Sequence, residues 1–262
     1  MVVRILATLV LLASLLGAPA AADDPPLRVS APHSLMPLVT NFAQQFGVTN
    51  VITIVVSERS SNAVTGPLRT GDIDLALSDT PTNDIAFHDT AIAAVPFAIV
   101  VNPATGVSTL APPRVKAIFE HAVTSWKDAG GANVPVVTIE RPKRSATEVL
   151  LEQAFGLSPA RRPDTIEDAS GSVVAAVRAN PGGVGIVGLP FAGSLDGVTV
   201  VTIGGAAPSA ATIQANSYPL FAYEHAVTFG SATLTVSRFI AFMTTQSETW
   251  RENGFIPMRD LR

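Results

Sequence analysis

Short runs of apolar residues alternate along this chain with segments whose apolar residues recur every three or four positions. The first pattern predicts buried strands and the second predicts amphipathic helices. The predicted strands span 27–31, 51–57, 72–79, 93–103, 134–140 and 184–189. The predicted helices span 34–47, closed by Gly47, and then 111–123, 145–155, 172–183 and 232–246. A short helix at 63–70 is disfavoured by Gly66-Pro67. This alternation indicates an α/β protein.

The first 22 residues have the pattern of an export signal. Arg4 precedes an apolar stretch at 5–17, and the small residues that follow include Ala20 and Ala22 as an A-x-A pair. This order predicts a secretory signal peptide at 1–22; an uncleaved membrane anchor is the alternative. The chain has no cysteine, so it has neither a lipobox for acylation nor a disulfide. We therefore expect a periplasmic or secreted protein that is stabilised by its core alone.

Charge and motif content disfavour several classes of function. The formal net charge is −4, whereas a non-specific nucleic-acid binder usually carries a basic excess. His88, His121 and His225 have no metal-ligand spacing, and there is no cysteine to complete a zinc site. No G-x-S-x-G elbow occurs, which disfavours a hydrolase. We expect no nucleic acid, no metal and no cofactor.

The stretch IERPKRSATEVLLEQAF at 139–155 gathers three cations and two hydroxyls where a strand gives way to a helix. Ser145 and Glu148 have the spacing of a capping box, so Ser145 is interpreted first as a helix cap. Arg141, the first amides of the helix and the hydroxyls of Ser145 and Thr147 would together suit a tetrahedral oxyanion. A surface arginine near a capped helix remains an equal alternative.

Two further strand–helix junctions, near 31–35 and 57–63, also carry small hydroxyl residues. In open α/β sheets, ligands bind outside the carboxyl ends of the strands, where helix N-termini point. Free amides at those N-termini attract anions. The three junctions therefore predict one anion site assembled from separate parts of the chain.

Five segments resemble, in the same order, motifs of the periplasmic phosphate-binding proteins, the PstS-like components of phosphate ABC importers. They are GDIDLALSD (71–79), 118–155, NPGGVGIVGL (180–189), SYPLF (217–221) and GFIP (254–257). The resemblance covers essentially the whole mature chain. It implies a type II periplasmic-binding-protein fold with two lobes, a hinge and an interlobe ligand cleft. Lobe I would be 23–98 plus 218–262, lobe II 99–217, and the hinge would lie near 99–102 and 217–219.

The resemblance also implies the function and the ligand residues. The chain would be a monomer that binds inorganic phosphate, delivers it to ABC permease membrane subunits and catalyses no reaction. The residues that match the family's site are His33, Ser34, Leu35, Ser61, Asp79, Arg141, Ser145, Ala146 and Thr147. Three features depart from the family pattern: Ala146 replaces a glycine, the loop at 57–64 lacks glycines, and His33 stands where a hydroxyl is usual.

Asp79 would distinguish phosphate from sulfate. A carboxylate in an anion site is unfavourable unless the ligand carries a proton, as HPO₄²⁻ and H₂PO₄⁻ do and sulfate does not. The alternative role for Asp79 is that of a turn residue before Thr80-Pro81. For Ser34 and Ser61 the alternative is helix capping alone, and for His33 it is an exposed loop position.

Other functions remain as alternatives. The chain could be a binding protein or sensor for another oxyanion or small ligand, or a secreted protein that kept the fold and lost phosphate binding. A phosphatase-like hydrolase with Ser145 as nucleophile is disfavoured because no general base is apparent nearby. We expect Trp126 and Trp250 to be packing residues. Arg161-Arg162 is interpreted as a solvated loop.

Overall fold

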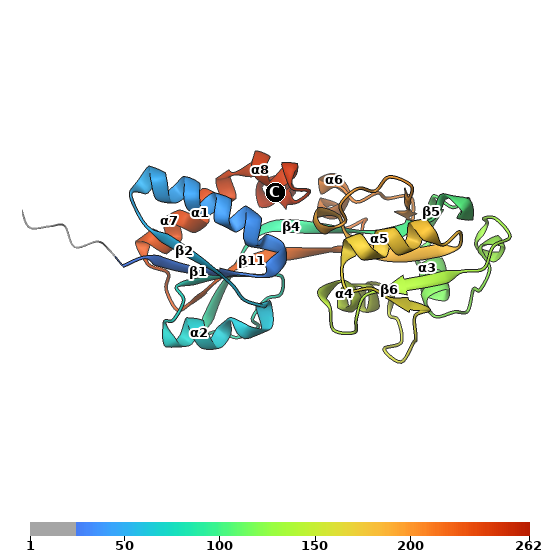
Figure 1. The fold of residues 1–262 in the computed structure, drawn as a ribbon, viewed down its shortest axis with the longest axis horizontal. Coiled ribbons are helices and arrows are strands. Elements are labelled where there is room, and N and C mark those ends of the chain that lie inside the picture. Colours follow the sequence, from blue (N-terminus) through green and yellow to red (C-terminus); the bar gives the residue numbers. More distant parts are fainter. Residues whose placement is uncertain (1–24) are drawn as a thin grey trace, which may run out of the picture.

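The computed structural model describes residues 25–262, so the predicted signal peptide at 1–22 lies outside the described residues. The helices and strands fall into two groups, and the long strand β4 (Phe87–Val101) runs from one group to the other (Figure 1). Helices α1, α2, α7 and α8 belong to one group, and α3, α4, α5 and α6 belong to the other (Figure 1). Among residues 25–262, no helix combines the length and apolar character needed to cross a membrane.

One mixed sheet runs through both groups. Its spatial order is β2 (Ile54–Glu58), β1 (Leu27–Ala31), β3 (Leu75–Ser78), β11 (Phe221–Phe229), β4, β8 (Gly183–Gly188), β6 (Val137–Glu140) and β7 (Thr165–Ile166). Strand β1 is parallel to β2 and β3, and β6 is parallel to β7 and β8. The central strand β4 is antiparallel to both β11 and β8. The sheet thus has a parallel part at each end, and each part has its own carboxyl edge.

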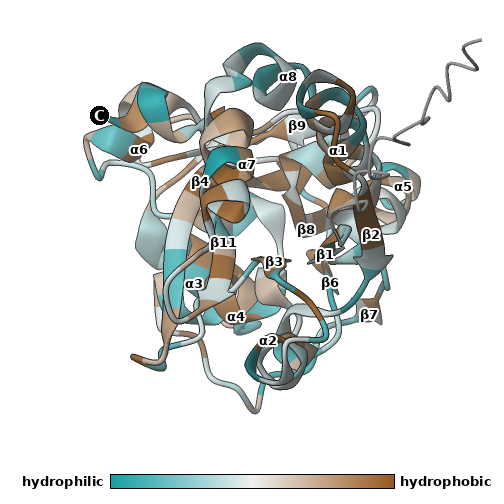
Figure 2. Ribbon diagram, turned by 90° about the vertical axis from the view of Figure 1, so that its left-hand side faces the viewer, coloured by the Kyte–Doolittle hydropathy of each residue, from teal (hydrophilic) through white to brown (hydrophobic). Residues whose placement is uncertain are grey.

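The remaining strands are short. Strands β12 (Ile256–Pro257) and β9 (Thr199–Val200) pair with β4, while β5 (Thr109–Leu110) and β10 (Thr202–Ile203) form a separate two-stranded sheet. The helices are α1 (Met36–Asn50), α2 (Thr65–Thr70), α3 (Pro112–Phe119), α4 (Ala146–Phe155), α5 (Ser170–Ala179), α6 (Ala210–Gln214), α7 (Leu234–Thr245) and α8 (Ser247–Glu252). Hydrophobic and hydrophilic residues alternate along α1 and α7 (Figure 2), as expected for helices that pack one face against a sheet. The predicted α/β class is confirmed.

The end of the first helix differs from the prediction. Helix α1 continues past Gly47 to Asn50, and Val51 closes it in the left-handed conformation, with φ 54°. Strand β2 consequently begins at Ile54, later than predicted. Gly47 serves a different purpose: a Cβ there would lie 2.8 Å from the carbonyl oxygen of Ile52. The glycine permits the chain to pass close to the helix as it returns to the sheet.

Three other elements also differ from the pattern-based expectation. Strand β4 begins at Phe87, and β11 was not predicted as a strand. Helix α2 forms even though it contains Gly66 and Pro67. Pro67 lies in the first turn of α2, where a backbone N–H would have no partner within the helix, so the missing donor costs little there.

Both tryptophans are fully buried, which confirms that they are packing residues. Trp126 Nε1 donates a hydrogen bond to the carbonyl oxygen of Gly182 at 2.8 Å. Trp250 Nε1 donates to the carbonyl oxygen of Met243 at 2.8 Å, and its ring centroid lies 5.2 Å from that of Phe42. Each indole therefore buries its apolar surface while its one polar group stays satisfied.

Candidate functional site

The parallel strands β2, β1 and β3 end at one edge of the sheet, and the predicted residues of the first half of the chain follow them. Residues His33–Leu35 form a 3₁₀ turn after β1, and a second such turn begins at Ser61 after β2. Asp79 comes directly after β3, and its N–H donates to Ser61 Oγ at 3.1 Å. The fold therefore brings Ser61 and Asp79 into contact across 18 positions of sequence.

The three predicted residues after β1 lie in different environments. The exposed His33 places Nδ1 3.0 Å from Glu58 Oε2, and this hydrogen bond raises the pKa of His33. Ser34 is exposed. Leu35 is fully buried, and its N–H donates to the carbonyl oxygen of Pro32 at 2.9 Å. Of these three, Ser34 offers a hydroxyl for which the described residues provide no partner.

The second set of predicted residues follows β6. Ser145 is the N-cap of α4, and its hydroxyl accepts a hydrogen bond from the Glu148 N–H at 3.2 Å, which confirms its capping role. Ala146 and Thr147 are the first two residues of the helix, where backbone N–H groups have no intrahelical acceptor. Ser145, Ala146 and Thr147 thus form one cluster of donors.

The three cations of this junction have different environments. Arg141 is half-buried, and among the described residues its buried Nε has no hydrogen-bond partner. Burial lowers the pKa of Arg141, and the charge of Asp168, just before α5, opposes this effect. Lys143 donates to the carbonyl oxygen of Pro159, and the exposed Arg144 has a left-handed backbone with φ 72°. Arg141 is therefore the cation at this junction whose buried donor stays unpaired within the described part of the chain.

The two sets of residues lie at the carboxyl edges of the two parallel parts of the sheet. Within residues 25–262, no hydrogen bond or ion pair links the set of Ser61 and Asp79 to the set of Arg141 and 145–147. Hydroxyls, amides and a guanidinium are donors that suit a tetrahedral oxyanion, whereas the carboxylate of Asp79 can only accept hydrogen bonds.

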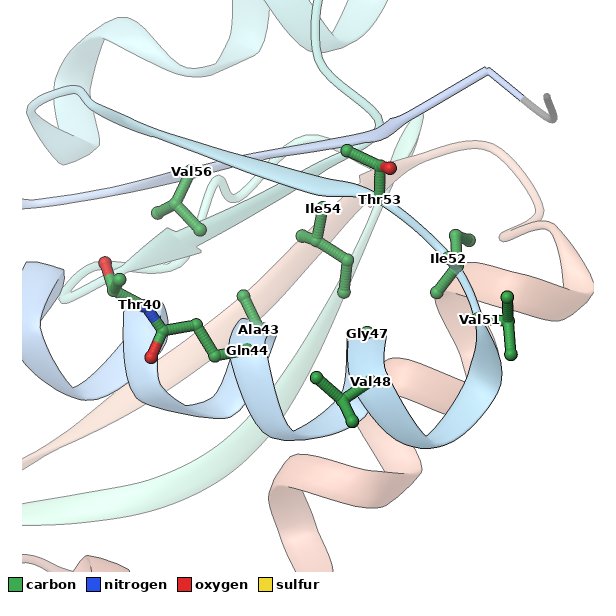
Figure 3. A pocket seen from close by; sticks show the side chains of 10 residues that line it. All are labelled: Thr40, Ala43, Gln44, Gly47, Val48, Val51, Ile52, Thr53, Ile54 and Val56. Atoms are coloured by element: carbon green, nitrogen blue, oxygen red, sulfur yellow. The ribbon is translucent and has the colours of Figure 1, made fainter.

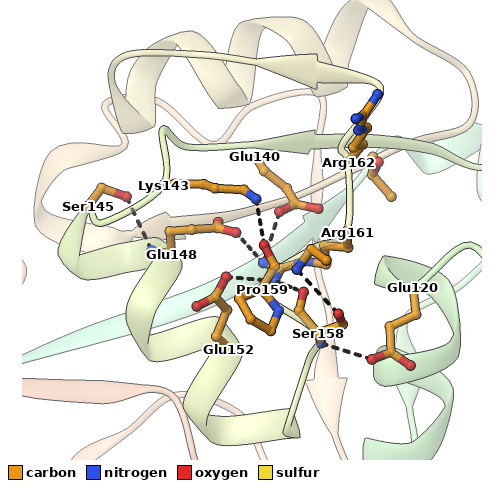
Figure 4. A network of polar contacts seen from close by, with 12 residues as sticks. Glu120, Glu140, Lys143, Ser145, Glu148, Glu152, Ser158, Pro159, Arg161 and Arg162 are labelled. Atoms are coloured by element: carbon orange, nitrogen blue, oxygen red, sulfur yellow. Dashed lines mark hydrogen bonds and ion pairs between the residues drawn. The ribbon is translucent and has the colours of Figure 1, made fainter.

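A buried ionic cluster lies directly behind the Arg141 junction, and sequence analysis missed it. Arg161 was expected to be solvated, but only 3% of its side chain is exposed. Its Nη2 lies 3.0 Å from Glu140 Oε2 and also contacts Glu148 Oε1, while its Nη1 lies 2.9 Å from Glu152 Oε1 (Figure 4). The interpretation of Arg161 as a solvated residue is therefore wrong. The partners come from positions 9 to 21 residues away, and a local pattern cannot show such contacts.

This cluster also changes the role of Glu148. The capping-box spacing led us to expect its carboxylate to return to the start of the helix, but the carboxylate bonds Arg161 instead. Burial, together with a hydrogen bond to Glu140, raises the pKa of Glu148 to about 8. A group with this pKa is mostly protonated at neutral pH, which reduces the negative charge gathered around the single guanidinium.

A second buried acid lies on β11 beside the first set. Glu224 is 1% exposed, and its Oε2 has no hydrogen-bond partner among the described residues. His225 on β11 is paired with Ser78 on β3. Because the two strands are antiparallel, Glu224, one residue before His225, lies beside Asp79, one residue after Ser78. Burial, and then the charge of Asp79, raise the pKa of Glu224 to about 8. The only sequence signal for this residue is a glutamate within the apolar run 221–229.

An open hollow of about 670 Å³ lies between α1 and β2, away from these residues (Figure 3). Its lining is largely apolar: Thr40, Ala43, Gln44, Gly47, Val48, Val51, Ile52, Thr53, Ile54 and Val56. None of the predicted ligand residues lines it.

Most of the chain matches a known protein family. Residues 17–247 match a family described as the PBP superfamily domain. The phosphate-binding protein PstS of Bacillus subtilis (strain 168) is 27% identical over 247 residues, which cover 90% of this chain and 82% of that protein.

Solved structures show the same fold. An ABC-type phosphate transport receptor from Vibrio cholerae has a TM-score of 0.72 at 21% identity, over 88% of this chain and 99% of the receptor. A putative phosphate ABC transporter substrate-binding protein with bound phosphate, from Clostridium perfringens, has a TM-score of 0.73 at 19% identity, over 89% of this chain and 99% of that protein. The predicted periplasmic-binding-protein fold is confirmed by these matches.

Proposed function

The chain belongs to the PBP superfamily, and from this premise we propose that it is a solute-binding protein that captures inorganic phosphate for an ABC importer. The relative from Bacillus subtilis is named a phosphate-binding protein, and both solved structures described above are named as components of phosphate transport. The observation that carries the proposal is the buried Arg141 Nε, which has no partner within residues 25–262, beside the amides at the start of α4. A desolvated cationic donor of this kind is costly unless an anion pairs with it.

In this proposal phosphate is bound between the two sets of residues. Arg141, the amides of Ala146 and Thr147, and the hydroxyl of Thr147 contact oxygens from one side, while Ser34 and Ser61 contact them from the other. Ser145 keeps its capping role, because its hydroxyl can accept from Glu148 and still donate to the ligand.

Asp79 accepts a hydrogen bond from the protonated oxygen of the phosphate. Sulfate has no such proton at neutral pH, so a negative sulfate oxygen would face the negative carboxylate of Asp79. A site built around a ligand hydroxyl can reject the analogue that lacks it by a factor of about 10⁴.

We further propose that residues 23–98 plus 218–262 form one lobe and 99–217 the other. The chain would cross between them near Ile99–Asn102 and near Ser217–Pro219. Tyr218 lies at the second crossing and donates its hydroxyl to the carbonyl oxygen of Phe97, just before the first crossing, at 2.8 Å. Ligand binding would favour a closed form that docks as a monomer on the permease outside the cytoplasm, and no reaction would be catalysed.

Isothermal titration of ligand-stripped mature protein with phosphate, sulfate, arsenate and molybdate tests this function. We expect phosphate to bind far more tightly than sulfate, and Asp79→Asn to reduce this preference by at least tenfold. If phosphate produces no heat while another anion binds tightly, the phosphate assignment is wrong. Unchanged selectivity in Asp79→Asn would refute the role given to the carboxylate. Turnover of p-nitrophenyl phosphate that is lost in Ser145→Ala would instead support an enzyme.

A further inference from the structure

Arg59 lies at the same edge of the sheet as Ser61 and Asp79. It follows Glu58, the last residue of β2, and its N–H donates to the carbonyl oxygen of Ala31, the last residue of β1, at 2.9 Å. This bond continues the ladder between the two strands and holds the Arg59 backbone only two positions before Ser61. The fold therefore fixes the position of the Arg59 backbone close to Ser61.

Arg59 points away from helix α1. Ile54 and Val56 line the hollow beside α1, and Glu58 bonds His33 just before that helix. Side chains alternate between the two faces along an extended strand. Arg59 therefore lies on the opposite face from these residues and is not part of the Glu58–His33 contact.

The Arg59 side chain has a buried donor for which residues 25–262 provide no acceptor. Its Nε is buried and makes no hydrogen bond within residues 25–262, and none of the ion pairs in that part of the chain includes Arg59. Asp79 lies at the same edge of the sheet, but no hydrogen bond or ion pair within residues 25–262 joins its carboxylate to Arg59. Burying a guanidinium N–H without an acceptor is unfavourable, so this geometry indicates a partner from outside the chain.

Arg141 shows the same features in the other half of the molecule. It too follows the last residue of a strand that ends at a carboxyl edge, and its Nε is likewise buried without a partner among the described residues. Arg161 shares the buried Nε, but both of its terminal nitrogens bond carboxylates. Arg59 and Arg141 therefore form a matched pair, one at each carboxyl edge.

We propose that Arg59 is a second guanidinium contact of the anion site and that it makes the site selective for a doubly charged tetrahedral oxyanion. The inference rests on the proposed function and extends it. Arg141 and Asp79 alone have a formal charge of zero, whereas Arg59 raises the site to +1. The loop that contains Arg59 lacks glycines, so a long cationic side chain supplies the contact that main-chain amides alone would otherwise make.

Titration calorimetry with inorganic phosphate at low and moderate salt tests this proposal on wild type, Arg59→Gln, Arg59→Lys and Arg114→Gln. Arg114 lies on the exposed side of α3 and serves as the matched control. We expect Arg59→Gln to weaken binding by about tenfold to a hundredfold, the loss typical of a charge-assisted hydrogen bond. Arg59→Lys should lose less, and Arg114→Gln should bind like wild type.

Salt dependence separates a ligand contact from a structural role. Removing a cation that touches the anion should make phosphate affinity less sensitive to ionic strength, whereas a purely structural loss would leave that sensitivity unchanged. If Arg59→Gln does not fold, the test uses Arg59→Met, which keeps the apolar part of the side chain and removes the charge. Wild-type phosphate affinity in a folded variant that lacks the charge would overturn the proposal. A wild-type protein that binds no phosphate would instead refute the proposed function itself.

Discussion

Replacing Glu224 by glutamine should stabilise the protein, and the gain should depend on pH. Glu224 is fully buried, and burial together with Asp79 raises its pKa from 4.5 to about 8. At neutral pH the folded protein therefore keeps the proton while the unfolded chain releases it. Stability falls as pH rises from about 4.5 to about 8, because the unfolded state binds fewer protons over this interval. Glutamine keeps the shape of the protonated acid and cannot ionise.

The size of the gain follows from the pKa difference. One pKa unit corresponds to about 1.4 kcal/mol, and the group is too deeply buried for solvent to screen it. Glu224→Gln should therefore raise the free energy of unfolding by about 3 kcal/mol at pH 7 and by about 5 kcal/mol above pH 8. Near pH 4 the gain should vanish, since the glutamate is then protonated in both states.

Urea unfolding of the ligand-free protein at pH 4.5, 7 and 8.5 measures this gain. The buried Trp126 and Trp250 provide the fluorescence signal. Glu252→Gln is the matched control, because Glu252 is exposed at the end of α8. The difference in the free energy of unfolding between Glu224→Gln and wild type should grow with pH. A difference that is constant with pH, or that grows on acidification, would refute the assignment of a neutral buried acid.

Two further predictions concern residues that hold the second half of the molecule together. Arg161→Ala should cost about 3–5 kcal/mol at pH 7, because three buried or half-buried acidic side chains lose their common partner, and acidification, which neutralises the acids that are still ionised, should reduce the loss. Thermal unfolding of Arg161→Ala measures this loss, with Arg162→Ala at the exposed neighbouring arginine as the control. Equal stability of the two variants would contradict the prediction. Gly182→Ala would place a Cβ 1.7 Å from the carbonyl oxygen of Pro135, so we expect a loss of about 3 kcal/mol. Gly66→Ala, which meets no atom within 4 Å, should not be destabilised in the same unfolding assay.

Local patterns predicted most of the helices and strands, since periodicity and capping residues act within a few positions. Ser145 was identified as a cap for this reason. The end of α1 was misplaced because Gly47 is needed for the close approach of Ile52, a contact that a helix-end rule does not include. Strand β11 was missed because its identity comes from pairing with β3 and β4 on either side.

The predicted ligand residues were partly brought together by the fold. Ser61 and Asp79 touch, and Ser145, Ala146 and Thr147 share the start of α4, as their positions after strands led us to expect. Contact of these residues with phosphate stays a prediction for the titrations above.

Most strands and helices, and the three places where a strand gives way to a helix near the predicted ligand residues, could be read from the amino-acid sequence, because each depends on neighbours in the chain. Only the tertiary structure decided which charges are buried. The cluster around Arg161, the neutral acid Glu224 beside Asp79 and the buried Nε of Arg59 each arise where segments distant in sequence exclude water. Burial changes the energy of a charge far more than any neighbour in the sequence does, and it exists only once the chain is folded.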